Sequence, residues 1–155
     1  MKVRAWYGLT GEIEVESELW HLVRIGGVPL PHPPVINLLL RRGLPRGDRL
    51  RLSYLHEFGH FQTLPIAVAH VLLLLAARQA RGRASLPPLE LAALAVAHEA
   101  VWELTSEAYV VSHDGAAYRE TYRRNPNPLV PAFWAAMGGL GLGLSLWLLR
   151  RKHDS

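Results

Sequence analysis

LVPAFWAAMGGLGLGLSLWLL, at residues 129–149, is an uninterrupted apolar segment without a charged side chain. Its length matches the roughly 20 residues that an α-helix needs to cross about 30 Å of hydrocarbon. Basic residues follow directly at positions 150–152, and Trp134 and Trp147 lie toward its two ends, as interfacial aromatic residues do. The segment therefore predicts a C-terminal transmembrane helix, and we expect an integral membrane protein in contact with the lipid bilayer.

A stripe of small residues runs along one face of this predicted helix. It consists of Ala135, Gly139 and Gly143, which are spaced four residues apart. Helices in membranes approach one another closely along such stripes. We therefore expect a homo-oligomer that associates through the Gly139/Gly143 face.

The composition excludes several classes of protein. The chain has 155 residues, of which 50% are apolar and 19% are charged, and the net charge of +4 comes from short Arg clusters that border apolar stretches. These clusters lack the interleaved aromatic residues of a nucleic-acid surface, so we expect no nucleic-acid partner. Because the chain has no cysteine, any metal must be held by histidine and carboxylate ligands.

The length is that of one domain, and we expect a single domain over residues 1–155. A small β region with a proline-rich connector occupies residues 1–34 in this prediction. Residues 35–128 hold a metal-motif helix and a helical hairpin, and residues 129–149 form the transmembrane helix. The predicted fold class is a mainly α integral membrane protein with a small N-terminal antiparallel sheet.

The N-terminal region combines strand-like runs with a connector. Residues 3–7, 12–16 and 19–25 are rich in β-branched and aromatic residues, which predicts three antiparallel strands. Residues 26–34 contain four prolines and are predicted to be a connector, because proline cannot lie in an interior strand or helix. Residues 35–42 are predicted to form a short helix.

Two apolar stretches, at residues 61–80 and 88–111, are joined by a basic turn bounded by prolines and predict a helical hairpin. Each stretch also contains ionisable residues, and such residues at membrane depth are costly and usually serve a function. They are His70 in the first stretch and His98, Glu99, Glu103 and Glu107 in the second.

The motif that carries chemistry is HExxH, which here reads His56-Glu57-Phe58-Gly59-His60 and stands directly before the first apolar stretch. On a helix, residues four apart share one face about 5–6 Å apart, so both imidazoles can reach one metal ion. The Glu beside the first His can polarise a water bound to that metal. The motif therefore predicts a metal site.

A catalytic zinc site takes three protein ligands, so one ligand is still missing. Glu99, Glu103 and Glu107 are spaced four apart and fall on one stripe of the second hairpin helix. Counting outward from the turn brings Glu103 and Glu107 level with His60, whereas Glu99 lies about one turn away. Spacing alone leaves these carboxylates open as the third ligand.

HEFGH, followed after a helical segment by Glu103-Leu-Thr-Ser-Glu107-Ala-Tyr, resembles the gluzincin zinc metallopeptidases. In that family a Glu on a later helix, in an ExxxD-type motif, completes the HExxH site. The membrane-embedded gluzincins, such as the CAAX prenyl proteases and the heat-shock quality-control peptidase of bacterial membranes, similarly place apolar helices between the two motifs. The resemblance implies a zinc metalloendopeptidase of a prokaryotic cytoplasmic membrane.

The resemblance also implies a role for each matching residue. His56, His60 and Glu103 would bind Zn²⁺, and Glu57 would be the general base that activates water against a peptide or membrane-protein substrate. Glu107, which stands where the family has Asp, would orient a ligand histidine.

Stabilisation of the oxyanion in such a reaction needs a further hydrogen-bond donor. Tyr54, Tyr109 and His113 are candidates, and the sequence does not select among them.

Three other functions remain open. HEFGH at the start of an apolar helix is also similar to the site-2 proteases, for which Asp114 would be the third ligand, but Asp114 is expected in a polar loop, so Glu103 is favoured. A di-iron membrane oxidase would use Glu57 and His60 as an ExxH element, yet such sites usually need a second ExxH, which the carboxylate stripe lacks. The last alternative is a non-enzymatic membrane scaffold.

Overall fold

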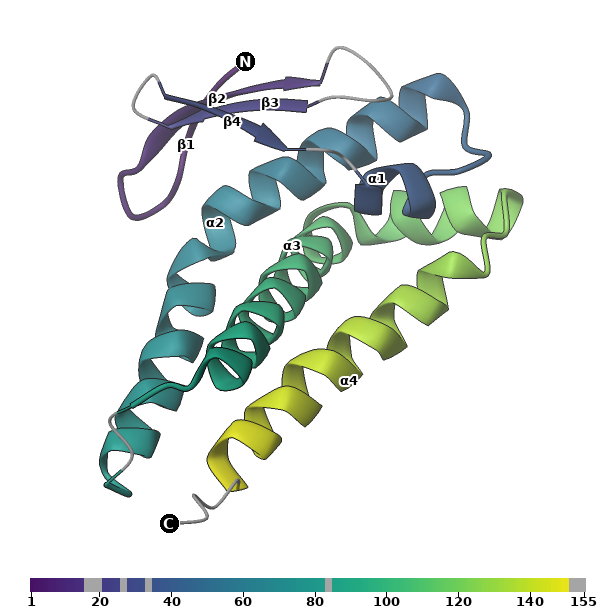
Figure 1. Cartoon of the computed structure of the whole chain (residues 1–155). Helices are drawn as coiled ribbons and strands as arrows, with labels where there is room; N and C mark the ends of the chain where they lie inside the picture. The colour runs from purple at the N-terminus through teal and green to yellow at the C-terminus, as the bar shows by residue number, and fades with distance from the viewer. Residues whose placement is uncertain (16–20, 26–27, 33–34, 83–84, 151–155) are drawn as a thin grey trace.

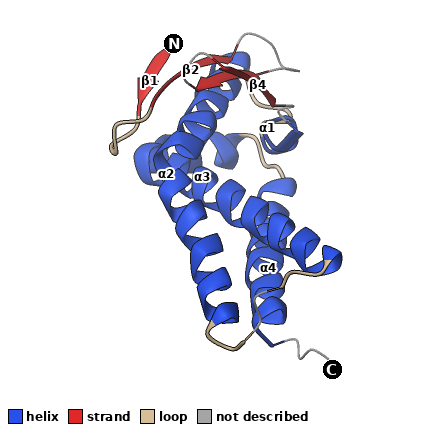
Figure 2. Cartoon of the chain, turned by 60° about the vertical axis from the view of Figure 1, so that its left-hand side comes forward, coloured by secondary structure: helices blue, strands red, loops and turns tan. Residues whose placement is uncertain are grey.

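A four-stranded sheet lies across one end of three long helices (Figures 1 and 2). The structure, a computed structural model, describes residues 1–15, 21–25, 28–32, 35–82 and 85–150. The elements follow the order β1 (Lys2–Arg4), β2 (Thr10–Val15), β3 (His21–Ile25), β4 (Val28–His32), α1 (Val35–Leu40), α2 (Arg46–Gln79), α3 (Pro88–Arg124) and α4 (Leu129–Arg150). The predicted mainly helical fold with a small N-terminal antiparallel sheet is therefore confirmed.

The predicted C-terminal helix is present as α4, and the predicted hairpin is present as α2 and α3. Within the described residues, α2 and α4 are long and apolar enough to cross a membrane. Both run from the sheet end of the molecule to the opposite end, and α3 returns between them (Figure 1). Residues 151 and 152, which were expected to end the apolar segment, lie outside the described residues.

Both hairpin helices are longer than the apolar stretches predicted. Helix α2 begins at Arg46 and carries HEFGH in its interior, and α3 continues to Arg124. The expectation that Asp114 lies in a loop is wrong, because the residue sits inside α3 at a kink with φ −132° and ψ 28°. Beyond the kink, Tyr118 is buried in a cluster with Leu44, Leu52 and Val110, and this burial stabilises the continued helix.

The proline-rich segment does not act only as a connector. Residues 28–32 form β4, which pairs with β3 at the edge of the sheet, where proline is tolerated. The first predicted strand is shorter than residues 3–7, since β1 ends at Arg4 and the chain turns there with Gly8 N–H donating to the Ala5 carbonyl. Residues 16, 19 and 20 of the other predicted strands lie outside the described residues.

The sheet packs onto α2 just beyond HEFGH. Val3 and Ile13 bury their side chains against Phe61. A Cβ atom on Gly11 would lie 2.4 Å from the Phe61 ring, so only glycine allows this approach. The Tyr7 hydroxyl donates to the Phe61 carbonyl at 2.5 Å, and this carbonyl has no helical donor because Pro65 lacks an N–H.

Helices α2 and α3 touch backbone to backbone at the motif. A Cβ atom on Gly59 would lie 2.7 Å from the carbonyl oxygen of Ser106. The Trp102 indole donates to the His60 carbonyl at 3.1 Å across the same contact. The glycine between the two histidines therefore lets the carboxylate helix reach them.

The far ends of the three helices are tied together by a buried arginine. Arg78 of α2 donates to the Leu148 carbonyl of α4 at 3.0 Å and to the Ser85 carbonyl at 3.1 Å, and it forms an ion pair with Glu90 of α3. Cations are favourable at the carbonyl end of a helix, so Arg78 stabilises the last turn of α4.

The small-residue face of α4 is turned away from the other helices. A Cβ atom on Gly139 or Gly143 would meet no neighbouring atom within 4 Å, whereas one on Gly141 would lie 3.0 Å from Val101 of α3. Of these three glycines, Gly141, which is not part of the predicted stripe, is the one that packs against another helix of this chain. Association through the Gly139/Gly143 face stays a prediction.

Gly59→Ala should destabilise the protein by about 1–3 kcal/mol, because the added methyl group must displace the Ser106 backbone. Gly47→Ala is the matched control, since Gly47 is exposed in the same helix and a Cβ atom there meets nothing within 4 Å. We expect that control to change stability by less than about 0.5 kcal/mol. Thermal unfolding in detergent, followed by circular dichroism, measures both, and equal effects would contradict the close contact.

Candidate metal centre

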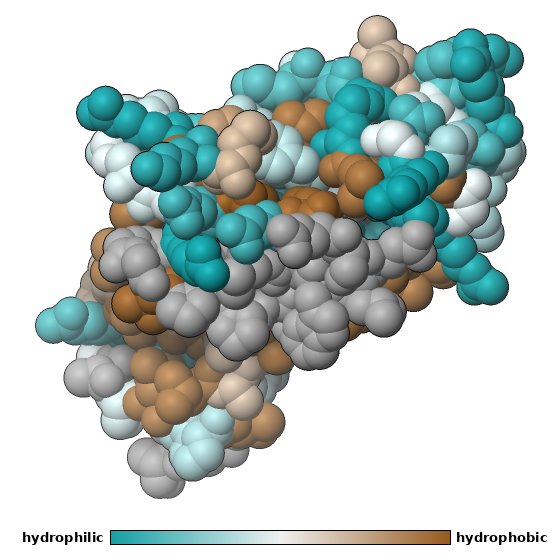
Figure 3. Space-filling model, turned by 90° about the horizontal axis from the view of Figure 1, so that it is seen from above, coloured by the Kyte–Doolittle hydropathy of each residue, from teal (hydrophilic) through white to brown (hydrophobic). Residues whose placement is uncertain are grey.

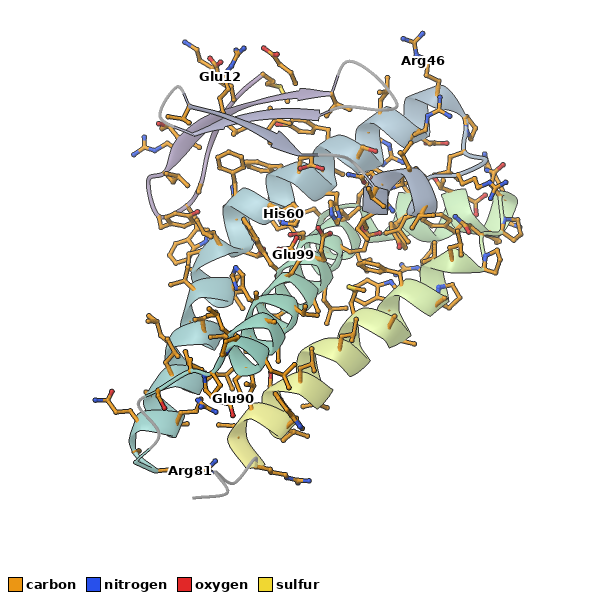
Figure 4. All side chains as sticks on the ribbon, in the orientation of Figure 1. Glu12, Arg46, His60, Arg81, Glu90 and Glu99 are labelled. Atoms are coloured by element: carbon orange, nitrogen blue, oxygen red, sulfur yellow. The ribbon has the colours of Figure 1, made fainter. Side chains whose placement is uncertain are left out.

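His56 and His60 of α2 meet Glu103 of α3 in the interior of the molecule. One ligand atom from each residue lies within 4.8 Å of the others, and all three side chains are buried. This group could hold a metal ion, as the sequence predicts. In Figure 4 the labelled His60 lies between Arg46 at the upper end of the molecule and Arg81 at the lower end.

The distances between the ligand atoms suit a small divalent metal. His56 Nε2 lies 3.0 Å from Glu103 Oε2, and His60 Nε2 lies 3.6 Å from Glu103 Oε1. With zinc–ligand bonds of about 2.0–2.2 Å, two ligand atoms of a tetrahedral site lie about 3.3 Å apart. The observed separations fall on either side of that value.

The proton position on His56 follows from its second partner. His56 Nδ1 lies 2.9 Å from Glu107 Oε2, and an ionised carboxylate only accepts hydrogen bonds. His56 Nδ1–H is therefore the donor. In the neutral imidazole, Nε2 then turns its lone pair toward Glu103, which is the arrangement that metal-binding histidines need.

A serine fixes the proton on His60 in the same way. The Ser106 hydroxyl lies 2.8 Å from both His60 Nδ1 and the Trp102 carbonyl. Its single proton goes to the carbonyl, so His60 Nδ1–H donates to the serine oxygen. His60 Nε2 consequently also turns a lone pair toward Glu103.

When both imidazoles are neutral, two lone pairs and a carboxylate thus converge in one buried place, where a bound cation would offset their repulsion. Imidazole and carboxylate donors suit several divalent metals, and the donor set alone does not single out zinc. Sequence reasoning missed Ser106, although its spacing of three residues from Glu103 puts it on the same helix face.

Behind His56, Glu107 is held by a buried arginine. Arg41 forms two parallel hydrogen bonds with the Glu107 carboxylate, at 2.7 and 2.5 Å, and the Tyr118 hydroxyl donates to it at 2.9 Å. Burial by itself would raise the pKa of Glu107, but Arg41 and His56 outweigh it, and the pKa lies well below its usual range. Burial and the nearby Glu107 raise the pKa of Tyr118, which stays a hydrogen-bond donor.

Glu57, the predicted general base, is buried beside the ligands and accepts a hydrogen bond from Asn37 Nδ2 at 2.9 Å. Asn37 lies in α1, and Arg41 directly follows that helix, so this short segment positions both acidic side chains next to His56. Sequence reasoning missed both residues, because nothing local in residues 35–41 signals contacts to positions 57 and 107.

The other candidate ligands lie elsewhere. Asp114 forms an ion pair with Arg51 and is outside the metal group of the described residues. Glu99, labelled on α3 in Figure 4, is exposed and also outside that group. Glu107 orients His56 instead of joining the group. Of the carboxylates that spacing left open, the structure brings Glu103 to both histidines.

The three candidates for oxyanion stabilisation are connected to Phe58 by a series of ring contacts. Its ring stacks on Tyr54 with centroids 6.2 Å apart and meets the edge of Tyr109 at 5.7 Å, while Tyr109 stacks on His113 at 3.7 Å. Phe58 packs against the core that faces the sheet and also against Tyr109 of α3, and these side chains are outside the metal group of the described residues. The oxyanion role of these residues stays a prediction.

Comparison with protein-family models, curated proteins and solved structures finds no match to the chain.

Glu103→Ala should abolish stoichiometric binding of added Zn²⁺ or Co²⁺, because it removes the one carboxylate that faces both histidines. Glu99→Ala and Asp114→Ala are matched controls that remove a carboxylate from the same helix and should leave one metal ion per chain. Elemental analysis after gel filtration measures the occupancy. Full occupancy in Glu103→Ala together with loss in Asp114→Ala would instead favour the site-2 arrangement.

Glu107→Gln should weaken metal binding by about 10–100-fold, since the amide no longer fixes the proton on His56 Nδ1. Competition with a chromogenic chelator gives the affinity. Glu120→Gln is the control, because Glu120 lies in the same helix but bonds only exposed arginines among its described contacts. An unchanged affinity in Glu107→Gln would contradict the orienting role.

Proposed function

We propose that this chain is a small membrane-bound zinc metallopeptidase. The observation that carries the proposal is that both histidines of HExxH converge on Glu103 while the Glu of the motif is buried beside them. Two imidazoles and one carboxylate are a ligand set of catalytic zinc, and they leave a fourth position for water or substrate.

Zinc bound here would supply a Lewis acid that polarises the peptide carbonyl and acidifies water. Glu57 takes the proton as the oxygen of water bonds to the carbonyl carbon, and it passes that proton to the nitrogen of the leaving amine as the C–N bond breaks. Asn37 orients the Glu57 carboxylate through its hydrogen bond. The Arg41–Glu107 pair holds His56 in the tautomer that binds metal.

The proposal includes the location of the protein. Helices α2 and α4 would cross the bilayer, since both are long and apolar enough to do so. The resemblance of HEFGH and the Glu103 motif to membrane-embedded gluzincins supports a prokaryotic cytoplasmic membrane and a peptide or membrane protein as the substrate.

Glu57→Gln should retain zinc and lose proteolysis by about 10²–10⁴-fold, the usual contribution of a general base. His56→Ala should lose both zinc and proteolysis, and Glu120→Gln should keep both. The assay uses purified protein with casein and a library of quenched fluorescent peptides, alongside elemental analysis. Zinc-loaded wild-type protein that cleaves neither would contradict the peptidase; two irons per chain would point to the di-iron oxidase.

A further inference from the structure

The surface of the three long helices is apolar on the side of the metal centre away from the sheet. Seen from above, hydrophilic residues cover much of the described sheet end, and hydrophobic residues gather toward the lower left of the view (Figure 3). The exposed large apolar side chains of α2 and α4 come after the metal motif along α2 and from the middle of α4 onward. They are Ile66, Val68, Leu72, Leu73, Leu140, Leu142 and Leu146.

Trp6 marks where this apolar surface begins. Its side chain is 75% exposed, yet it is held in place, because its indole N–H donates to the Gln62 carbonyl at 3.0 Å and its backbone N–H to the Gln62 side chain at 3.2 Å. Gln62 is the second residue of the apolar stretch 61–80. Tryptophan at the edge of an apolar stretch is typical of the membrane–water interface.

Helix α1 turns its apolar side chains outward and its polar side chain inward, which is the opposite of a helix that faces water. It exposes Val35, Leu38 and Leu39 by 53%, 39% and 44% and buries Asn37 against the metal centre. Water on its outer side would favour the opposite arrangement. The exposed face of α1 therefore calls for an apolar or interfacial surrounding.

Helix α1 lies next to the N-terminal end of α4, the predicted C-terminal membrane span. The Asn127 side chain donates to the Leu39 and Leu40 carbonyls at 2.9 and 3.0 Å, which ties α1 to the chain just before α4 begins at Leu129. Arg42, the next exposed position after Leu39, is basic and complements anionic lipid headgroups.

Helix α1 and Trp6 contact α2 at nearly the same level along its axis. Helix α1 contacts α2 at Glu57, and Trp6 contacts it at Gln62, five residues farther along. Five residues of helix span about 7.5 Å, which is within the 5–10 Å that an interfacial helix buries. The metal ligand His60 lies between these two positions.

We propose that α1 and Trp6 lie in the interface of the lipid bilayer and hold the metal centre at that depth. The apolar face of α1 enters the boundary between headgroups and acyl chains, while its inner face positions Glu57 and, through Arg41, Glu107. The inference rests on the membrane attachment in the proposed function and deepens it, because a site at this depth would act on peptide segments where they leave the bilayer.

The absence of cysteine makes the depth measurable with single spin labels. The full chain carrying Leu38→Cys or Trp6→Cys is labelled and reconstituted into vesicles of phosphatidylcholine and phosphatidylglycerol. Accessibility to oxygen, which partitions into lipid, and to a water-soluble nickel chelate is read from power saturation of the spectrum. Leu140→Cys is the control for lipid, and Arg46→Cys, at the upper end of the molecule in Figure 4, is the control for water.

We expect the ratio of oxygen to nickel accessibility at Leu38 and Trp6 to fall between the two controls. Leu39→Cys, on the same face of α1, repeats the measurement if the label at Leu38 disturbs folding. A ratio at both α1 positions equal to that of Arg46 would overturn the inference while leaving the peptidase untouched. Shielding from both reagents would show that protein covers α1 and would also overturn it, and a water-exposed Leu140 would overturn the membrane attachment as well.

Discussion

His56, His60 and Glu103 turn their ligand atoms toward one buried place, and several contacts in this structure hold them there. Gly59 removes the side chain that would keep α3 away from α2. Glu107 and Ser106 then fix the protons on the outer nitrogens of His56 and His60. Without these contacts the histidines could rotate or change tautomer, and the convergence on Glu103 would be lost.

A short helix links this centre to the surface. Burying Glu107 is costly unless it is paired, and the two parallel hydrogen bonds from Arg41 meet that cost. Arg41 is held in turn by the Tyr122 hydroxyl at 2.7 Å, and that hydroxyl donates to the Leu40 carbonyl at 2.8 Å. The position of α1 thereby determines the orientation of both acidic groups beside His56, and a change in its surroundings would reach the metal centre through two side chains.

The sequence predicted the features that depend on local pattern. An uncharged segment of membrane length predicted α4, and counting residues from the hairpin turn placed Glu103 and Glu107 level with His60. Asn37 and Arg41 could not be foreseen, because their partners lie 20 and 66 residues away along the chain. The edge strand β4 was missed because proline is excluded from interior strands but not from edge strands. The length of α3 was underestimated because the burial of Tyr118 in a cluster with residues of other segments is not a local property of the sequence.

X-ray absorption at the zinc edge of purified protein loaded with one equivalent of Zn²⁺ tests the metal centre most directly. We expect nitrogen and oxygen ligands at about 2.0–2.2 Å, with the outer scattering of two imidazole rings. His60→Ala should retain at most one imidazole. A zinc spectrum without imidazole scattering, or one that is identical in the wild type and His60→Ala, would contradict it.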